Sequence, residues 1–269
     1  MDEASSTRVP EVAVAIERAE APSPVVLVCD HASNHLPARY GLLGLRADDL
    51  FKHSAWDPGA LAISRRLSAL MDAPLVYGCI SRLVLDVNRD LSDVDSIVET
   101  ADGAIVPGNS GLTAGERERR AAEIYAPYHA AVEDLLAKRA QRGRRSALVA
   151  IHSFAPSLQG AVRPWHCGVI FASDSRLGGA LVKGLQVQDG LVVGVNQPYA
   201  PSDRVYHTMS SHGEDSGIPA VMIEVRNDLV SNDDGQRAWA TRLAPLLQSA
   251  AQMSLNAEGA EPPKHQATG

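Results

Sequence analysis

The stretch "PVVLVCD", residues 24–30, is a continuous apolar run that ends abruptly in an aspartate. An uninterrupted run of β-branched and aliphatic residues is typical of a strand that other elements cover on both faces. Similar runs occur later in "APLVYGCISRLVLDV" (73–87), "SALVAIHSF" (146–154), "HCGVIFASD" (166–174) and "PAVMIEVRND" (219–228). These runs predict a buried sheet, with one or two strands coming from residues 73–87.

Helical periodicity lies between these runs. Residues 57–72 predict a helix with a proline in its first turn, and residues 114–143 and 233–253 predict two longer amphipathic helices. This alternation predicts an α/β fold, a three-layer α/β/α arrangement around a central, largely parallel or mixed sheet. We expect a single catalytic domain over residues 23–252. A partly flexible N-terminal extension (1–22) would precede it, and a disordered C-terminal tail (253–269) would follow.

Composition excludes several classes of function. The 269 residues carry a net charge of −7, which argues against a nucleic-acid surface or a polybasic membrane anchor. No stretch approaches the ~20 apolar residues that a membrane span needs. The three cysteines form no CxxC pair, so we expect reduced thiols. These features predict a cytoplasmic monomer or small homo-oligomer without a nucleic-acid or membrane partner.

Ionisable residues follow the apolar runs. Asp30 and His31 come directly after "VVLVC", His152 follows "ALVAI", and Glu224 follows "AVMI". In open α/β sheets, ligands bind beyond the carboxyl ends of the strands. We therefore expect these side chains to share one rim of the sheet.

Two imidazoles and a carboxylate from separate elements are the usual ligand set of a catalytic zinc. His31 and His152 supply the imidazoles, and we predict them as metal ligands. Asp57 in "HSAWDPG" is the preferred third ligand, although a residue at this position can instead cap the following helix. Asn34 and His53 are lesser candidates for the third position.

A carboxylate beside a metal can act as a general base, and Glu224 is predicted in this role. Arg226 lies two residues further on and therefore faces the same side of a strand. Arg82, Asn88 and Arg89 surround "LVLDV" and suit an anionic substrate, because arginine binds carboxylates in bidentate fashion. Arg82 is also a candidate to stabilise an oxyanion. The predicted substrate-binding residues are Asn88, Arg89, Arg226 and His212, the last from the loop "VYHTMSSHGED".

Taken together, these motifs resemble the N-formylglutamate amidohydrolase (N-formylglutamate deformylase) family. The stretches that carry the resemblance are "CDHASN" (29–34), "HSAWDPGA" (53–60), "RLVLDVNRD" (82–90), "YAPYH" (125–129), "AIHSF" (150–154) and "HGEDSGIPAVMIEVRNDL" (212–229). The resemblance implies a fold like that of the zinc exopeptidases. It also implies metal binding by His31 and His152, a base at Glu224, an oxyanion or substrate donor at Arg82, and a carboxylate clamp of Asn88 with Arg89. The peptidase relatives carry a glutamate three positions after the first histidine, where this chain has Asn34.

We therefore predict a metal-dependent amidohydrolase of amino-acid metabolism whose cofactor is zinc or another divalent metal. We expect it to cleave the N-formyl or N-acyl amide of an acidic amino acid, converting N-formylglutamate and water to formate and glutamate. One alternative is the same chemistry on another N-acyl amino acid or small peptide. A second is a non-catalytic protein that binds carboxylate ligands on the same fold, which the asparagine at position 34 would favour.

Overall fold

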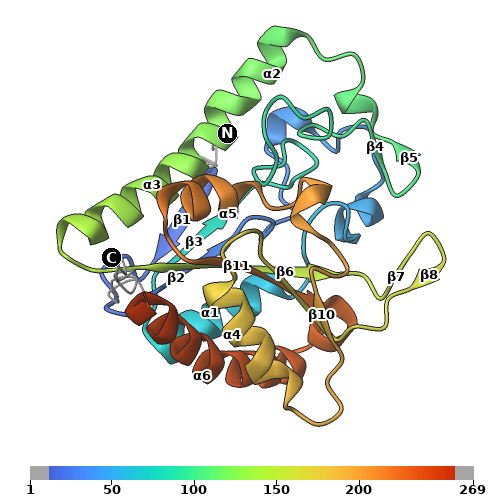
Figure 1. The fold of residues 1–269 in the computed structure, drawn as a ribbon. Coiled ribbons are helices and arrows are strands. Elements are labelled where there is room, and N and C mark those ends of the chain that lie inside the picture. Colours follow the sequence, from blue (N-terminus) through green and yellow to red (C-terminus); the bar gives the residue numbers. More distant parts are fainter. Residues whose placement is uncertain (1–11, 258–269) are drawn as a thin grey trace, which may run out of the picture.

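The computed structural model describes residues 12–257, which form helices and strands in alternation (Figure 1). The strands are β1 (Val14–Glu17), β2 (Val25–Cys29), β3 (Leu75–Gly78), β4 (Thr100–Ala101), β5 (Ala104–Ile105), β6 (Ala147–Phe154), β7 (Ser157–Leu158), β8 (Ala161–Val162), β9 (Cys167–Ile170), β10 (Val193–Val195) and β11 (Ala220–Arg226). The α-helices are α1 (Ala60–Met71), α2 (Ala114–Arg120), α3 (Ala126–Gln141), α4 (Ser175–Gln186), α5 (His207–His212) and α6 (Asp233–Ala257).

Seven of the strands form the central sheet, in the order β1-β3-β2-β6-β11-β9-β10. The four central strands β3, β2, β6 and β11 run parallel to one another. Strand β1 is antiparallel to β3, and β9 is antiparallel to β11 but parallel to β10. The sheet is therefore mixed around a parallel centre, and the predicted α/β fold class is confirmed.

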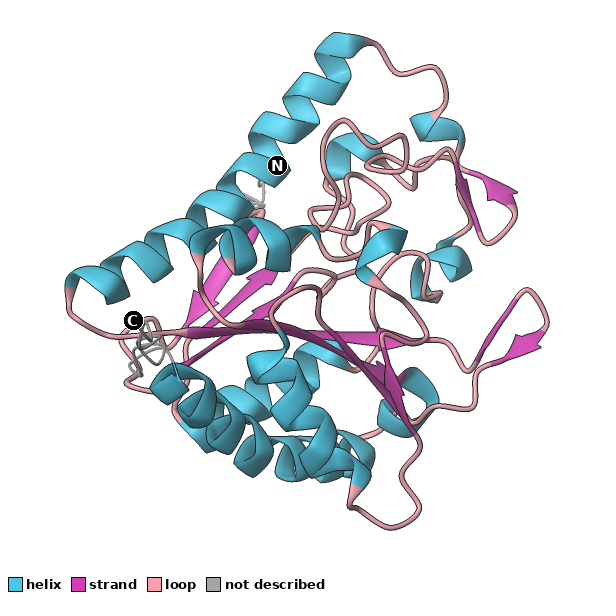
Figure 2. Ribbon diagram, viewed as in Figure 1, coloured by secondary structure: helices cyan, strands magenta, loops and turns pink. Residues whose placement is uncertain are grey.

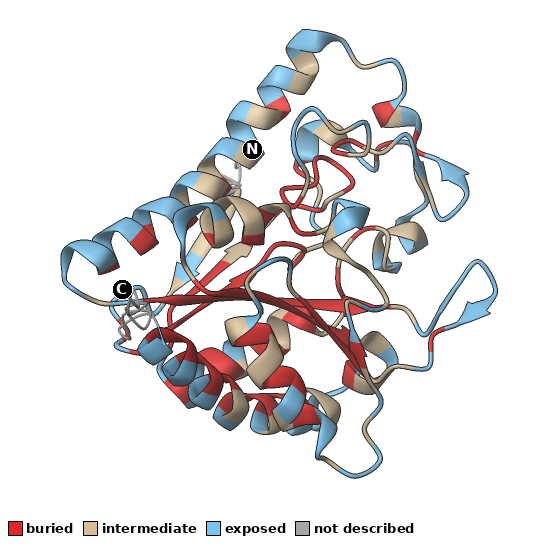
Figure 3. Cartoon of the chain, viewed as in Figure 1, coloured by how far each residue is buried: buried red, intermediate tan, exposed pale blue. Residues whose placement is uncertain are grey.

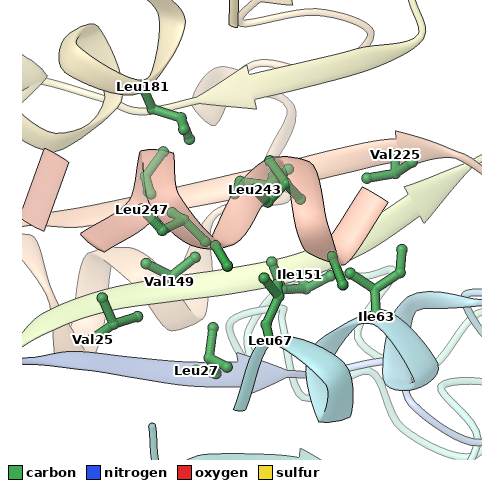
Figure 4. Packing of buried hydrophobic residues seen from close by; sticks show 14 of the residues in the cluster. Val25, Leu27, Ile63, Leu67, Val149, Ile151, Leu181, Val225, Leu243 and Leu247 are labelled. Carbon is green, nitrogen blue, oxygen red and sulfur yellow. The ribbon is translucent and has the colours of Figure 1, made fainter. Parts of the chain in front are cut away.

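Helices cover both faces of this sheet (Figures 1 and 2). Helices α1, α4 and α6 lie on one face, whereas α3 and α5 lie on the other. Each face has its own apolar cluster, and every residue of β6 is buried between them (Figure 3). Figure 4 shows the first cluster, in which side chains of α1 and α6 pack on β2 and β6; it includes Val25, Leu27, Ile63, Leu67, Val149, Ile151, Leu243 and Leu247.

The predicted helix over 57–72 begins later than its sequence pattern, at Ala60. Gly59 precedes it with φ of 83°, and a Cβ there would lie 2.6 Å from the side chain of Val230. A glycine is required by both the positive φ and this close approach. Asp57 therefore stays outside the helix, and its carboxylate does not cap it.

The predicted long helix over 114–143 is one helical rod with a wider turn inside it. Residues 121–125 form a π-helical turn between α2 and α3, in which the Ala126 N–H bonds to the carbonyl of Ala121. Pro127 follows directly. Proline cannot donate a helical hydrogen bond and its ring crowds the preceding turn, so the wider turn lies where this conflict arises.

Of the one or two strands predicted within residues 73–87, one forms, and the apolar run "LVL" (83–85) is not part of it. These residues are buried in a turn, and strand β3 ends at Gly78. Backbone carbonyls that would accept hydrogen bonds in a sheet accept them here from two buried side chains. Asn109 donates to Leu83 O at 2.8 Å, and Arg120 donates to Val84 O at 2.9 Å. An apolar run can thus be buried without a β-ladder when side chains satisfy its backbone.

Several elements were not anticipated from the sequence. Strand β1 falls within the predicted N-terminal extension, yet it pairs with β3 at the edge of the sheet. The hairpins β4–β5 and β7–β8 are short and exposed. Helix α6 continues to Ala257, past the predicted domain end at 252. The remaining parts of the predicted extension and tail, residues 1–11 and 258–269, lie outside the described residues. Within residues 12–257, no helix combines the length and apolarity needed to cross a lipid bilayer.

Candidate active site

Three of the predicted metal ligands meet at the carboxyl end of the parallel strands. His31 follows β2, Asp57 lies in the turn before α1, and His152 lies in β6. The ligand atoms of these buried residues all lie within 4.8 Å of one another. Asp57 Oδ2 is 2.8 Å from His152 Nδ1 and 3.4 Å from His31 Nδ1. A backbone hydrogen bond of 2.9 Å from Asp57 N to His31 O holds the two segments together.

A second carboxylate stands behind each imidazole. His31 Nε2 is 2.7 Å from Asp86 Oδ1, and His152 Nε2 is 2.7 Å from Asp30 Oδ2. The other oxygen of Asp30 accepts hydrogen bonds from the hydroxyls of Tyr128 and Thr208, each at 2.7 Å. Carboxylates in this position orient a metal-binding imidazole and make it a better ligand. Both imidazoles therefore turn Nδ1 towards Asp57.

Several buried carboxylates surround the two imidazoles and need positive charge nearby. Asp30, Asp57 and Asp86 are all buried, and Arg82 is the cation that contacts Asp57. Burial opposes ionisation of Asp57, but Arg82 and the imidazoles outweigh it and hold its pKa well below the usual range. Burial likewise opposes a charged His152, but Asp30 and Asp57 raise its pKa well above the usual value. Two protonated imidazoles with Arg82 would balance the three carboxylates, and a divalent ion bound to neutral imidazoles would balance them equally well.

The separations between these atoms also fit an ion. Bonds of 2.0–2.1 Å in a tetrahedral zinc site place neighbouring ligand atoms about 3.3 Å apart. The observed 3.4 Å lies close to that value, whereas the 2.8 Å contact is a hydrogen-bond distance that would lengthen on binding an ion. Asp57 Oδ1 is buried without a hydrogen bond from any described residue, although Arg82 Nη2 approaches it to 3.2 Å. The donor set and its geometry therefore fit a divalent metal.

Glu224 lies on β11 directly opposite His152 of β6 in the parallel register. Its side chain is 4% exposed, and Oε2 has no hydrogen-bond partner among the described residues. Burial raises the pKa of Glu224 to about 7, and the nearby carboxylate of Asp57 also raises it. A carboxyl group that exchanges its proton near neutral pH is suited to general acid–base chemistry.

Arg82 crosses the rim of this site from the turn after β3. Its Nε donates to Ser54 O at 3.2 Å, and its Nη2 contacts His53 and Asp57. Its Nη1 lies 3.1 Å from His31 Nδ1. Because a guanidinium only donates, this contact requires a lone pair on that nitrogen. The lone pair therefore faces the centre of the site.

A cavity of about 90 Å³ opens beside these groups. It is lined by His31, His53, Asp57, Arg82, Asn88, Arg89, His152, Ser153, Tyr199, Val205 and Glu224. The predicted catalytic pair, the predicted metal ligands, and Asn88 with Arg89 are thus brought together. Asn88 also supports the wall, since its amide donates to Val205 O at 2.6 Å and accepts from the Thr208 N–H at 2.9 Å. Arg89 Nη1 donates to Arg204 O at 2.7 Å.

Three sequence candidates do not line this cavity. The guanidinium of Arg226 bonds to Asp228 at 2.8 Å and contacts Trp165 O. His212 lies on α5, where its Nε2 is 2.7 Å from His129 Nδ1. The amide of Asn34 donates to Leu50 O at 3.0 Å. His53, a lesser candidate, does line the cavity, and its Nε2 contacts Ser153 O at 2.5 Å.

Sequence reasoning missed three lining residues, Ser153, Tyr199 and Val205. Ser153 follows His152 within β6, and because successive residues of a strand face opposite sides, its position in the sequence gave no signal. Tyr199 and Val205 come from an irregular segment between β10 and α5. No periodicity or motif marks that segment; Val205 is held there by a long-range bond from Asn88, and Tyr199 by one from Arg163.

Comparison with known proteins places this arrangement in a family. The family model for N-formylglutamate amidohydrolase matches residues 23–231. A solved gene product of Agrobacterium tumefaciens is similar, with 41% identity, a TM-score of 0.88, and coverage of 93% of this chain and 97% of that one. The N-formylglutamate amidohydrolase of Ralstonia eutropha shares the fold, with 18% identity, a TM-score of 0.74, and coverage of 91% and 99%. No curated protein sequence matched. The resemblance predicted from the motifs is confirmed: the chain belongs to the N-formylglutamate amidohydrolase family and is a hydrolase of amide bonds.

Proposed function

We propose that this protein is a metal-dependent amidohydrolase that removes the N-formyl group of an acidic amino acid, converting N-formylglutamate and water to formate and glutamate. The observation that carries the proposal is the convergence of His31, Asp57 and His152 beside the buried, unpartnered carboxylate of Glu224. The family match and the name of the Ralstonia relative support the substrate.

The ion would be held by Nδ1 of His31, Nδ1 of His152 and the carboxylate of Asp57. Zinc suits this nitrogen and oxygen donor set, as do other divalent metals. When bound, such an ion supplies Lewis-acid chemistry and lowers the pKa of water to about 7. Asp86 and Asp30 keep the two imidazoles in the tautomer that presents Nδ1.

Glu224 provides the proton transfers. It accepts a proton from the attacking water as the water oxygen bonds to the formyl carbon, and it returns a proton to the amine nitrogen as the C–N bond breaks. Burial suits it to both steps, because the pKa of about 7 allows the carboxylate to gain and lose a proton at neutral pH. The guanidinium of Arg82 faces the same cavity and stabilises the negative charge that develops on the formyl oxygen.

Arg89 binds the α-carboxylate of the substrate from the far wall of the cavity. Two backbone carbonyls, Asn88 O and Arg204 O, fix its Nη1. Its Nε lies 3.6 Å from Asp95 Oδ2, and no hydrogen bond from its Nη2 to another described residue is formed, so the Nη2 group is open to a ligand. The Asn88 amide, with one N–H engaged by Val205 O, has a second N–H to offer the same carboxylate. The side chains of Arg226 and His212, predicted as further contacts, lie outside this arrangement.

The proposal is tested by formate release from purified protein, measured with N-formylglutamate, N-formylalanine and N-acetylglutamate. We expect near-stoichiometric metal, a preference for N-formylglutamate, loss of activity on chelation and recovery with zinc. Indifference to N-formylglutamate with rapid cleavage of another amide would reassign the substrate. Full activity in protein shown to be free of metal would reject the mechanism.

A further inference from the structure

Arg163 is a buried cation without an acidic partner among the described residues. It follows the β7–β8 hairpin and is 8% exposed. Its Nη1 contacts Ala155 O at 3.4 Å and the Tyr199 hydroxyl at 3.1 Å. Its guanidinium lies over the rings of Tyr199 and Phe154, 4.7 Å and 5.8 Å from their centroids. Charged groups are seldom buried this far unless they meet an opposite charge.

The contact with Arg163 fixes the direction of the Tyr199 hydroxyl. A guanidinium has donors and no acceptor, so the phenolic oxygen accepts and its own hydrogen points elsewhere. No described residue accepts that hydrogen. Tyr199 lines the cavity together with Glu224 and Arg82. The cavity wall therefore includes a phenol whose oxygen is held by a cation and whose hydroxyl hydrogen no described residue accepts.

We propose that Tyr199, with Arg163 behind it, binds a second carboxylate of the substrate and so selects for an acidic side chain. This inference rests on the proposed function, which assigns the first carboxylate to Arg89. The two positions come from different parts of the chain. Arg89 belongs to the turn after β3, whereas Arg163 reaches the cavity through Tyr199 from the segment after β8.

Tyr199 is the contacting residue, and Arg163 is a positioning residue that acts through it. Donation by Arg163 makes the phenol a stronger donor, and the positive charge behind the ring attracts an anion. A neutral amide in the same place gains little from that charge. The pair therefore discriminates between glutamate and glutamine side chains, which have nearly the same shape.

The test compares kcat/KM for N-formyl-L-glutamate and N-formyl-L-glutamine. We expect wild type to prefer the glutamate substrate, and Tyr199→Phe to reduce the ratio of the two values about 10-fold or more, the usual effect of losing a hydrogen bond to a charged group. Arg163→Gln should reduce the ratio similarly, and Arg163→Lys should restore part of it. The control is Arg242→Gln, because Arg242 also lies over an aromatic ring, Trp239 at 4.9 Å, but on the remote helix α6. It should leave the ratio unchanged.

A binding measurement separates this inference from the proposed function. Calorimetry with glutarate and with its monoamide, which carries a single carboxylate, needs no turnover. Wild type should bind glutarate more tightly, and Tyr199→Phe should remove the difference. If wild type releases no formate but this binding difference disappears in the variant, the proposed function fails and the inference stands.

Equal losses for both substrates in Tyr199→Phe, or a wild type that hydrolyses both equally, would overturn the inference and leave the deformylase activity intact. Should Arg163→Gln fail to fold, Tyr199→Phe still decides the matter because it removes a single hydroxyl group.

Discussion

Replacing Asp30 by asparagine should weaken metal binding without unfolding the protein. Asp30 Oδ2 accepts from His152 Nε2 at 2.7 Å, with the two side chains 0% and 3% exposed. The asparagine oxygen can still accept this bond, but it lacks the charge that makes the imidazole a strong ligand. The amide would then face the hydroxyls of Tyr128 and Thr208, which can rotate to accept from it.

The size of the effect follows from the kind of interaction lost. Hydrogen bonds to charged groups contribute about 1.5–3 kcal/mol, and each 1.4 kcal/mol changes an equilibrium constant about tenfold. Loss of the charge alone should therefore raise the Kd for zinc about 10- to 100-fold, which is the usual effect of removing a carboxylate behind a metal-binding histidine. The overall fold should persist, because His152 keeps its acceptor and the Tyr128 and Thr208 hydroxyls, although they lose the carboxylate that accepted their hydrogens, can accept from the new amide.

The measurement is a competition for zinc between the protein and a chromophoric chelator at pH 7.5. Thr208→Val is the matched control, since it removes one hydrogen bond to Asp30 Oδ1 and leaves the contact with His152 in place. It should change the Kd only a few-fold. A folded Asp30→Asn protein that binds zinc as tightly as wild type would refute the role given to this carboxylate.

Three further predictions concern the base, the buried turn and pH. Glu224→Gln should lower kcat about 10²- to 10⁴-fold while the protein keeps its bound metal, as measured by kinetics and metal analysis on one sample. Arg120→Met should cost about 3 kcal/mol in urea unfolding, because Val84 O and Gly108 O lose a buried donor; unchanged stability would contradict the account of that turn. Burial raises the pKa of Glu224 from 4.5 to about 7, so metal-free folded protein holds a proton that the unfolded chain releases between these values. The Tm of metal-free protein should therefore fall as the pH rises from about 5 to about 8, and Glu224→Gln should reduce this slope.

The parts of the fold that sequence predicted well are those with strong local signals. The run at 24–30 became β2, and the periodicity at 233–253 became most of α6. His31 and His152 were identified because polar residues directly after buried strands lie at one edge of a parallel sheet. The periodicity of a strand or helix, and a polar residue that ends an apolar run, can both be recognised from a few neighbouring residues.

The features that sequence missed depend on contacts between distant segments. Residues 83–85 have the composition of a strand, but Asn109 and Arg120 take their carbonyls, and neither residue is near them in the chain. The pairing of Tyr199 with Arg163 likewise joins two irregular segments. Local propensity carries no information about such partners, because the same side chains on an exposed loop would be solvated.

The proposed third metal ligand, Asp57, shows why spacing alone is an unreliable guide to a site. A ligand three positions after His31 would be Asn34, whose amide is instead engaged by Leu50 O. Asp57 reaches the same point from another segment, and its own N–H binds His31 O at 2.9 Å, so the backbone carries the two side chains as a unit. Gly59 then lets the chain turn away into α1 where a larger residue would collide with Val230. A carboxylate distant in the sequence can therefore share a site with His31, provided that a tight backbone contact holds the two segments together.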